Sequence, residues 1–512
     1  MVEAGETLGK IASLRYYWPE LTLAITVLML LTVDFFVRSK KRLPVVSIFA
    51  FLGSFISLFF CFKQMVMPSR NLFDRMVIHD SFSLFFKMII LLATLVIIFI
   101  SAKDDETNRM NQGEYFALLI SMALGAFVLA SSTNLLMVYL SLELVSLVSY
   151  VLAGYLKKDQ RSSEASMKYV IYGGVSSGAM IYGMSFLYGL TGSLEFGAIA
   201  TSLQQMDLTP ALSLALFVSS LFCLAGFGYK IACVPFHMWC PDVYEGSPTP
   251  VTAYFSIVPK VAGFAALARF FYGALSIPGE QAGTWVPIFN IEWPLMLAVI
   301  SVATMTLGNL VAFHQNSLKR LLAYSSIAHA GYILMAFVVL TQEALMAMLF
   351  YLSVYFFMNM GAFLVVIYVK NTTGSDQIEQ FKGLGWQGGW ATFLAISMAI
   401  FLFSLTGLPP TAGFIGKVYL FAAVIHEKWY WLALAGVLNS VISLYYYARV
   451  IKKMFFEEAT KEVASRFSLG YRLPYAQAGL LAILVFFTLL FGIYWSPLVN
   501  HTAQSVAFLG RF

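Results

Sequence analysis

Four ionisable side chains lie within long apolar segments of the sequence: Glu143, Lys230, Lys260 and Lys417. A charge at the centre of a membrane-spanning helix costs at least about 2.5–3.5 kcal/mol on insertion scales, so such residues are functional candidates by default. Burial favours the neutral form of a lysine, whereas a nearby carboxylate favours its charged form. A lysine near a glutamate can therefore gain and lose a proton as their separation changes. The four residues together predict a proton relay.

Prolines interrupt two of these segments next to a lysine. Pro235 follows Lys230 by five residues, and Pro409 and Pro410 precede Lys417. A proline inside a helix removes a backbone hydrogen bond and breaks or kinks the helix. Broken helices at membrane depth are tolerated where they line a wet cavity or pack within protein, and they mark ion sites in transporters. We therefore expect two broken helices, each beside a buried lysine.

Two histidines and two further basic residues are weaker candidates. His237 follows the first break, and His329 lies in the middle of another apolar segment. Histidine titrates near physiological pH, so each either supports the relay or is an ordinary core residue, and the sequence leaves both interpretations open. Lys87 and Arg269 lie nearer the ends of their segments, and we expect their charged groups to reach the membrane interface.

The elements that position these residues are predicted to be membrane-spanning helices. The chain of 512 residues is 60% hydrophobic and only 11% charged, whereas soluble domains contain about 25% charged residues. We count fourteen apolar segments near the length of roughly 20 residues that a span requires. Four of them hold the relay residues: 133–155, 211–239, 250–275 and 391–421. The predicted fold class is an all-α polytopic membrane protein, which excludes a soluble enzyme and a nucleic-acid-binding protein.

The order of the spans predicts an internal repeat. Helices 4–8 and 9–13 form two blocks of five, and an odd number of spans inverts the second block relative to the first. The fourth member of each block, helix 7 or helix 12, holds a lysine and the prolines. We predict three N-terminal helices in 1–113, a first five-helix repeat in 114–275, a second inverted repeat in 293–451 and a last helix in 474–495.

The distribution of basic residues predicts the orientation. Alternate loops are rich in lysine and arginine, beginning with Arg38, Lys40, Lys41 and Arg42. Cytoplasmic loops carry this excess, so both termini are expected on the periplasmic side of a bacterial cytoplasmic membrane. The sequence contains no CxxC pair and no nucleotide-binding motif, so we expect no metal and no cofactor in this chain.

Three stretches carry a resemblance to a known family: residues 235–264 (PFHMWCPDVYEGSPTPVTAYFSIVPKVAGF), 322–332 (LAYSSIAHAGY) and 407–417 (GLPPTAGFIGK). The chain resembles the antiporter-like membrane subunits of respiratory complex I. Within this family it is similar to the subunit N branch, because the stretch PDVYEGSPTPVTA is typical of that branch. The resemblance implies a glutamate–lysine pair of Glu143 and Lys230, a central lysine at Lys260 and a terminal lysine at Lys417.

The same resemblance implies a function and its setting. The chain would translocate protons as a membrane-arm subunit of an oxidoreductase that passes electrons from NADH or another donor to quinone. Flavin, iron–sulfur clusters and quinone would belong to other subunits. Expected partners are the lipid bilayer and the other membrane subunits, especially the neighbouring antiporter-like subunit and small membrane subunits. The alternatives are a subunit of a multisubunit Na⁺/H⁺ antiporter, a structural scaffold of the membrane arm and a stand-alone carrier.

Overall fold

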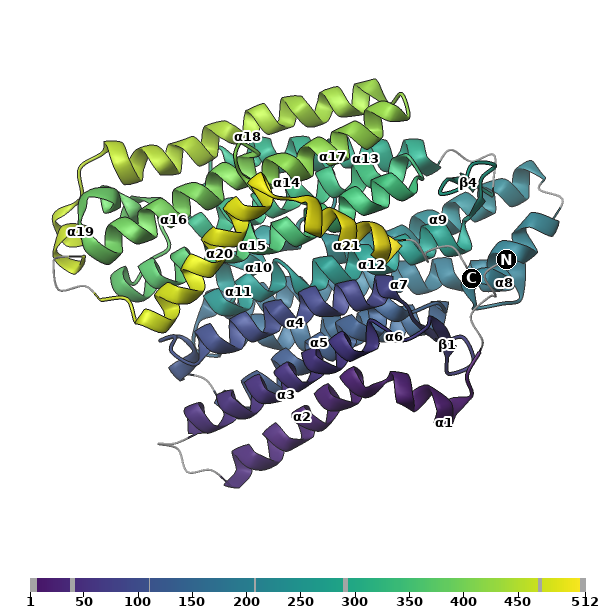
Figure 1. The fold of residues 1–512 in the computed structure, drawn as a ribbon, viewed down its shortest axis with the longest axis horizontal. Helices are drawn as coiled ribbons and strands as arrows, with labels where there is room; N and C mark the ends of the chain where they lie inside the picture. The colour runs from purple at the N-terminus through teal and green to yellow at the C-terminus, as the bar shows by residue number, and fades with distance from the viewer. Residues whose placement is uncertain are drawn as a thin grey trace.

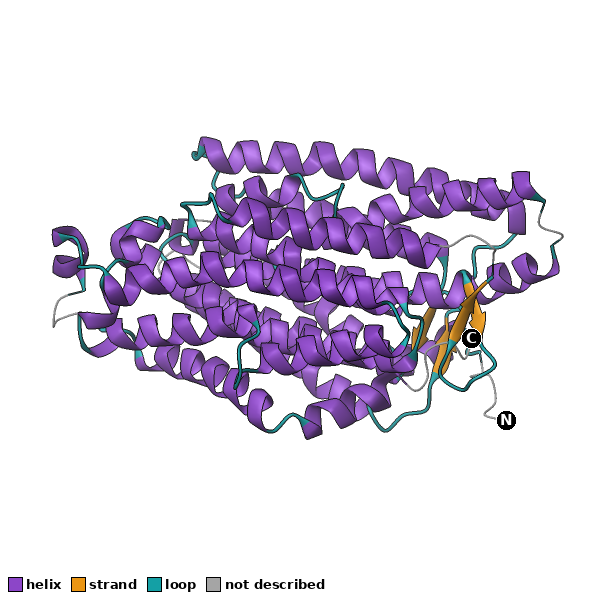
Figure 2. Cartoon of the chain, turned by 90° about the horizontal axis from the view of Figure 1, so that it is seen from above, coloured by secondary structure: helices purple, strands orange, loops and turns teal. Residues whose placement is uncertain are grey.

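The computed structural model describes residues 7–36, 42–109, 111–206, 209–288, 293–467 and 472–506. In this part of the chain fourteen helices are long and apolar enough to cross a membrane, which confirms a multi-pass membrane protein of the predicted fold class. The helices run roughly parallel, and two short hairpins lie at one end of the bundle (Figures 1 and 2). We call this end the strand end and the opposite one the basic end. The basic residues expected at 38, 40, 41 and 511 lie outside the described residues.

The N-terminal unit consists of three spans and a hairpin, and its charged residues lie mostly at the ends of helices. Its elements are α1 (Lys10–Ser13), η1 (Leu14–Tyr16), α2 (Trp18–Phe36), α3 (Arg42–Gln64), β1 (Arg70–Leu72), β2 (Val77–His79), α4 (Ser81–Ser101) and η3 (Thr107–Arg109). The two strands pair antiparallel. The α4 helix begins at Asp80, whose carboxylate accepts the backbone N–H of Ser83 in a capping box, the usual way of pairing free N–H groups in a first turn.

Five spans follow as the first block. Its elements are α5 (Gln112–Ser131), α6 (Leu135–Ala153), α7 (Gln160–Thr191), α8 (Phe196–Gln205), α9 (Pro210–Ile231), α10 (Trp239–Gly246), α11 (Thr249–Phe255), α12 (Val258–Ala274), β3 (Ser276–Pro278) and β4 (Trp285–Pro287). The structure divides the predicted span 250–275 into α11 and α12. The sequence analysis did not predict this break, although Pro259 in the first turn of α12 is a signal for it.

The second block and the last helices complete the bundle. They are α13 (Trp293–Ala312), α14 (Leu318–Val338), α15 (Gln342–Thr373), η4 (Ile378–Phe381), η5 (Leu384–Trp386), α16 (Gly389–Thr406), α17 (Ala412–His426), α18 (Tyr430–Phe456), α19 (Lys461–Arg466), α20 (Tyr475–Ile493) and α21 (Ser496–Val506). The most enclosed spans are α11–α12, α14 and α15. Two of the predicted site residues, Lys260 and His329, therefore lie on the most buried helices of the bundle.

Two helices of equal length have matching C-terminal ends. α7 and α15 each contain 32 residues and stop at a glycine with positive φ, Gly192 (68°) or Gly374 (80°). Successive spans alternate in direction, so α7 ends at the strand end and α15 at the basic end. The segment after each helix forms an isolated bridge with the residue that precedes an earlier span: Asn134–Glu195 and Ser317–Gln377.

Candidate proton-transfer site

Lys230 lies at the first helix break. It is the penultimate residue of α9, and its side chain is fully buried. The helix stops because Ala232 adopts a left-handed conformation (φ 60°), and Pro235 follows in the non-helical turn. The sequence analysis placed Lys230 in the middle of a span that extended to residue 239. The structure places it in the last turn of a helix that ends earlier, at Ile231.

A serine lies between Lys230 and the carboxylate expected to pair with it. The Nζ atom of Lys230 donates a hydrogen bond to Oγ of Ser146 on α6, at 2.8 Å. Glu143 lies on the same helix one turn before Ser146. It is half-buried, its Oε1 atom makes no hydrogen bond to any described residue, and no ion pair within 4 Å joins it to Lys230. The charge of Glu143 still acts on Lys230 through space, so the two interact without direct contact.

Lys260 lies at the break between α11 and α12. Its Nζ atom donates to the backbone carbonyl of Ser326 on α14, at 2.8 Å, and also to the Oγ atom of Ser326. Gly263, one turn along α12, packs against Lys230, because a Cβ atom built on it would lie 3.4 Å from the Lys230 Cγ atom. The two lysines therefore occupy neighbouring positions on α9 and α12.

A polar stripe on α14 leads from Lys260 towards Lys417. Ser326, His329 and Tyr332 follow one another at intervals of three residues, which places them along one face of the helix. The Nδ1 atom of His329 is hydrogen-bonded to the hydroxyl group of Tyr351, at 2.7 Å. The charges of both Lys260 and Lys417 act on His329, so this histidine lies between the two lysines.

Lys417 lies at the second helix break, on α17. Its Nζ atom donates to the backbone carbonyls of Thr406, at 2.8 Å, and Leu405, at 3.3 Å, in the last turn of α16. The same atom lies 4.4 Å from the ring centroid of Tyr332. The C-terminus of a helix carries a partial negative charge, and an aromatic face attracts a cation. The protonated form of Lys417 is thus stabilised without any carboxylate.

Comparison with known proteins places this site in a family. Residues 132–443 match the family described as NADH:quinone oxidoreductase/Mrp antiporter, transmembrane. "NADH-quinone oxidoreductase subunit N" of Anaeromyxobacter sp. (strain Fw109-5) is 46% identical over 514 aligned positions, which cover 96% of each chain. The chain belongs to the subunit N family of NADH-quinone oxidoreductase.

Solved structures agree with this assignment to the subunit N family. A chain of "Respiratory complex I from Thermus thermophilus with bound Aureothin" is 29% identical, with a TM-score of 0.75, covering 94% of this chain and 98% of that one. A chain of the "Mrp complex from Dietzia sp. DQ12-45-1b" is 19% identical, with a TM-score of 0.77, covering 96% and 97%. The second likeness shows that the fold is shared with an Mrp complex.

Within this subunit N fold, His237 is separate from the lysine chain. It is buried in the turn between α9 and α10, and its Nδ1 atom makes no hydrogen bond to any described residue. Burial lowers the pKa of His237 below its usual value. No hydrogen bond among the described residues joins it to Lys230 or Lys260, whereas His329 contacts groups on both sides. Of the two histidines, His329 is the one that the structure brings into the stripe.

Two predictions of interfacial charge are wrong. Lys87 does not reach the interface but forms a buried ion pair with Glu20, at 2.6 Å between Nζ and Oε1. Arg269 forms another with Asp80, at 2.7 Å between Nη2 and Oδ1. In both cases the partner comes from a distant part of the sequence. Pairing with a carboxylate compensates the buried positive charge, so the side chain does not have to extend into water.

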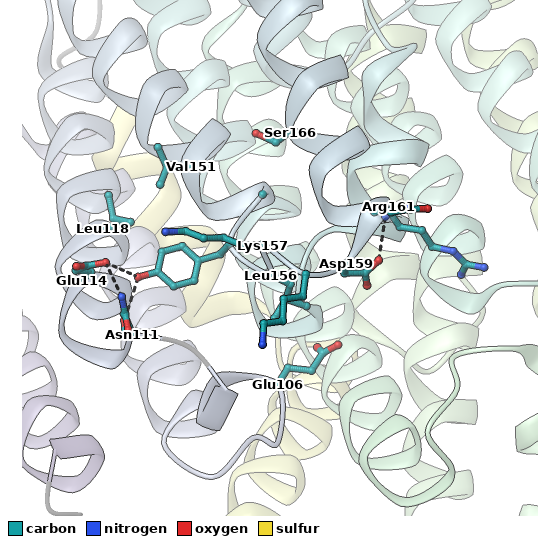
Figure 3. Close-up of a pocket in the computed structure, with 14 residues that line it drawn as sticks. Glu106, Asn111, Glu114, Leu118, Val151, Leu156, Lys157, Asp159, Arg161 and Ser166 are labelled. Carbon is teal, nitrogen blue, oxygen red and sulfur yellow. Dashed lines mark hydrogen bonds between the residues drawn. The ribbon is translucent and has the colours of Figure 1, made fainter. Parts of the chain in front are cut away.

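A separate cavity of about 1150 Å³ opens at the basic end, beside α5, α6 and α7 (Figure 3). Charged groups of both signs line it, including Glu106, Lys157 and Asp159. None of the four relay residues lines it. Val151 in its wall is about 12 Å along α6 from Glu143. Among the described residues no group of three or more histidine, cysteine, aspartate or glutamate side chains is arranged to hold a metal ion.

Proposed function

We propose that this chain is the proton-translocating subunit N of a complex-I-type oxidoreductase, and that its relay runs through Glu143, Lys230, Lys260 and Lys417. One observation supports this relay most directly. The ammonium groups of the three lysines are bonded to hydroxyl groups and backbone carbonyls, and no carboxylate of the described residues lies within 4 Å of any of them. A lysine without a fixed counter-charge can lose its proton without leaving a buried carboxylate unpaired.

The proposed path begins at the basic end and ends towards the strand end. Protons load Lys230, whose charge responds to Glu143, and pass to Lys260 one turn of α12 away. The stripe of Ser326, His329 and Tyr332 then leads to Lys417. Lys230, Lys260 and Lys417 each lie at or near an interrupted helix, as expected for ion sites at membrane depth. His237 remains a candidate for support at the first break.

The orientation follows from the charge of the two ends. Loops at the basic end hold most of the lysine and arginine residues of the chain, so we infer that this end is cytoplasmic. Both termini would then be periplasmic, in a bacterial cytoplasmic (inner) membrane. The matching ends of α7 and α15 at opposite ends of the bundle support two inverted repeats, 114–275 and 293–451, between the N-terminal helices (1–113) and the last span (474–495).

The partners proposed for the chain are other membrane subunits of the complex. Glu143 lies beside Leu140, Leu144 and Leu147, which are exposed on the outer side of α6. A charge next to an exposed apolar stripe fits contact with another membrane subunit better than contact with lipid alone. We infer that the neighbouring antiporter-like subunit covers this face, and that small membrane subunits complete the arm. Flavin, iron–sulfur clusters and quinone would be held elsewhere in the complex.

Two alternatives make different predictions. A subunit of a Na⁺/H⁺ antiporter would need sodium and no redox partner, and the low identity to the Mrp chain supports only a shared fold. A structural scaffold would tolerate loss of the lysines. The relay instead requires that each lysine change its protonation state.

The test compares Lys230→Ala and Lys230→Arg in the intact complex reconstituted in liposomes, with proton uptake and quinone reduction measured together. Arginine keeps a positive charge but does not deprotonate in proteins. We expect both variants to lose uptake and coupled reduction. Lys452→Ala, at an exposed position near the end of α18, is the control. Wild-type rates in both Lys230 variants would refute the relay, and sodium-dependent uptake without quinone reduction would favour the antiporter.

A further inference from the structure

A second cluster of buried charges lies outside the relay, at the strand end of the N-terminal unit. Lys87 on α4 and Glu20 on α2 are joined by a 2.6 Å ion pair, and their side chains are only 3% and 1% exposed. Lys87 is six residues into α4, which places it about 9 Å below the end of the helix. Both charges therefore lie within the protein at a depth where ionised groups are rare and mark functional sites.

A second ion pair lies beside the first. Arg269 on α12 donates to Asp80, and its Nε atom donates to the backbone carbonyl of Ala130, at 2.7 Å. Asp80 directly precedes α4, and α4 contacts α12. The second pair therefore fastens the N-terminal unit to the same helix that carries Lys260.

His79 directly precedes Asp80 of the second pair, and the charge of Lys87 in the first pair acts on it. Its ring is buried against Tyr16, at 5.1 Å between centroids. Burial and then the charge of Lys87 lower its pKa to about 4, although Asp80 and the backbone of Gln64 act in the opposite direction. The imidazole is therefore neutral at physiological pH and would hold an added proton only in transit.

Each of these residues presents a buried polar atom that makes no hydrogen bond to any described residue: Glu20 Oε2, His79 Nδ1, Asp80 Oδ2 and Arg269 Nη1. Buried polar atoms in proteins are almost always satisfied by protein or by ordered water. These four atoms belong to both ion pairs and to His79, and water bound to them would find the polar partners that a buried water requires.

Polar side chains on α4 also extend from this cluster towards the helix break beside Lys260. Thr94 lies seven residues after Lys87, on the same face of α4 and about 10 Å along the helix. The Oγ1 atom of Thr94 is hydrogen-bonded to the hydroxyl group of Tyr254, at 2.9 Å. Tyr254 lies in α11, two residues before the break that precedes Lys260. A hydrogen bond thus joins α4 to the helix whose end forms the break before Lys260.

We propose that Lys87, Glu20 and His79 form a second proton-exchange site, which connects the central break to the strand end and works in the same cycle as Lys417. The site deepens the proposed function and rests on it. A proton moves from the ammonium group of Lys87 to the carboxylate of Glu20, which leaves a neutral amine and a neutral acid, and the acid passes the proton through water to Nδ1 of His79. The imidazolium releases its proton to water at the strand end, and Lys87 takes a proton from the relay side, which restores its ion pair with Glu20.

The decisive variant neutralises both members of the pair at once, Glu20→Gln with Lys87→Met. Removing one partner leaves a buried unpaired charge and is harmful whatever the role of the pair, whereas neutral replacement of both is often tolerated. We expect the intact complex with both changes to assemble and to lose about tenfold or more of its proton uptake in liposomes. Arg75→Met with Glu195→Gln, an exposed ion pair at the same end, is the matched control and should leave uptake unchanged.

His79→Gln is the second variant, and it decides the outcome if the pair proves necessary for assembly. Glutamine keeps a polar group at this position but cannot act as a proton acceptor. We expect uptake to fall to a similar extent in this variant. Wild-type uptake in His79→Gln, or in the double variant, would overturn the second site. Lys417→Arg, measured in parallel, separates the two ideas, because normal uptake in that variant would refute the relay itself.

Discussion

The hydroxyl group of Ser146 accepts a hydrogen bond from the ammonium group of Lys230 at 2.8 Å. Glu143, the expected partner, lies one helical turn away and acts on Lys230 only through space. A neutral acceptor binds the protonated lysine without adding a counter-charge, whereas Lys87 is paired with a carboxylate. Lys230 is therefore held in place by one residue and influenced electrostatically by another.

Replacing Ser146 tests this division of roles. Ser146→Ala removes the acceptor of a hydrogen bond to a charged group, which contributes about 1.5–3 kcal/mol. We expect proton uptake coupled to quinone reduction to fall about tenfold or more, because 1.36 kcal/mol corresponds to a factor of ten. Ser146→Thr keeps the hydroxyl group and should retain most of the uptake. Equal rates in the alanine variant and the wild type would show that the bond is dispensable.

Gly407 provides a test at the second break. A Cβ atom there would lie 2.9 Å from Cδ of Lys417, and φ is 88°. Gly407→Ala should therefore displace the lysine and also strain the backbone by about 1–2 kcal/mol. Gly374→Ala is the matched control, because Gly374 has a similar φ of 80° but open space around it. We expect both variants to lower the melting temperature and only Gly407→Ala to abolish proton uptake.

Tyr332 is predicted to act through its aromatic face. Its ring lies 4.4 Å from the Lys417 ammonium group, and such contacts contribute about 0.5–2 kcal/mol. Tyr332→Phe keeps the face, whereas Tyr332→Leu removes it. The leucine variant should pump protons several-fold more slowly than the phenylalanine variant in the liposome assay. If the phenylalanine and leucine variants pump protons equally slowly, the effect comes instead from the hydroxyl group of Tyr332 and its hydrogen bond with Asn309.

Glu106 gives a pH-dependent prediction outside the membrane spans. Burial raises its pKa, but the charges of Lys370 and Lys319 and hydrogen bonds from Lys370 and Thr249 outweigh burial and lower the pKa to about 2. A depressed carboxylate pKa stabilises the fold above the usual pKa, and this contribution is lost as the pH falls through the folded-state value. The shift from 4.5 to about 2 corresponds to about 3 kcal/mol.

Glu106→Gln should therefore lower the melting temperature of the complex at pH 7. The difference from wild type should stay constant down to about pH 4.5 and shrink as the pH falls from 4.5 towards 2, measured by thermal unfolding in nanodiscs. Glu164→Gln is the control, because the side chain of Glu164 is 64% exposed in its pair with Lys168 and its loss should change stability little. A difference in melting temperature that grows as the pH falls would contradict the lowered pKa assigned to Glu106.

The sequence predicted the features that depend on local composition. Apolar runs mark the fourteen spans, prolines mark the breaks beside Lys230 and Lys417, and buried lysines stand out because charge is rare in lipid. The extent of each break was less predictable. The α9 helix ends at Ile231, four residues before Pro235, because Ala232 adopts a left-handed conformation that no local rule requires of alanine.

Features that depend on packing between distant segments were not predictable. Glu20 and Lys87 belong to different helices, and only the folded bundle shows that they are partners. Serines such as Ser146 and Ser326 are common in membrane helices, where they allow close packing, so their types alone do not mark them as ligands of a lysine. The break before Lys260 is the exception, since Pro259 was visible in the sequence.

The position of Lys417 at the last carbonyls of α16 links its protonation to the integrity of that helix. The carbonyl groups at the end of a helix have no partner within it, and here a side chain from the next helix supplies the cap. When Lys417 gives up its proton, the cap becomes a weaker donor and the end of α16 is held less firmly. Under the proposed relay, the proton occupancy of Lys417 would therefore be coupled to the rigidity of this helix end.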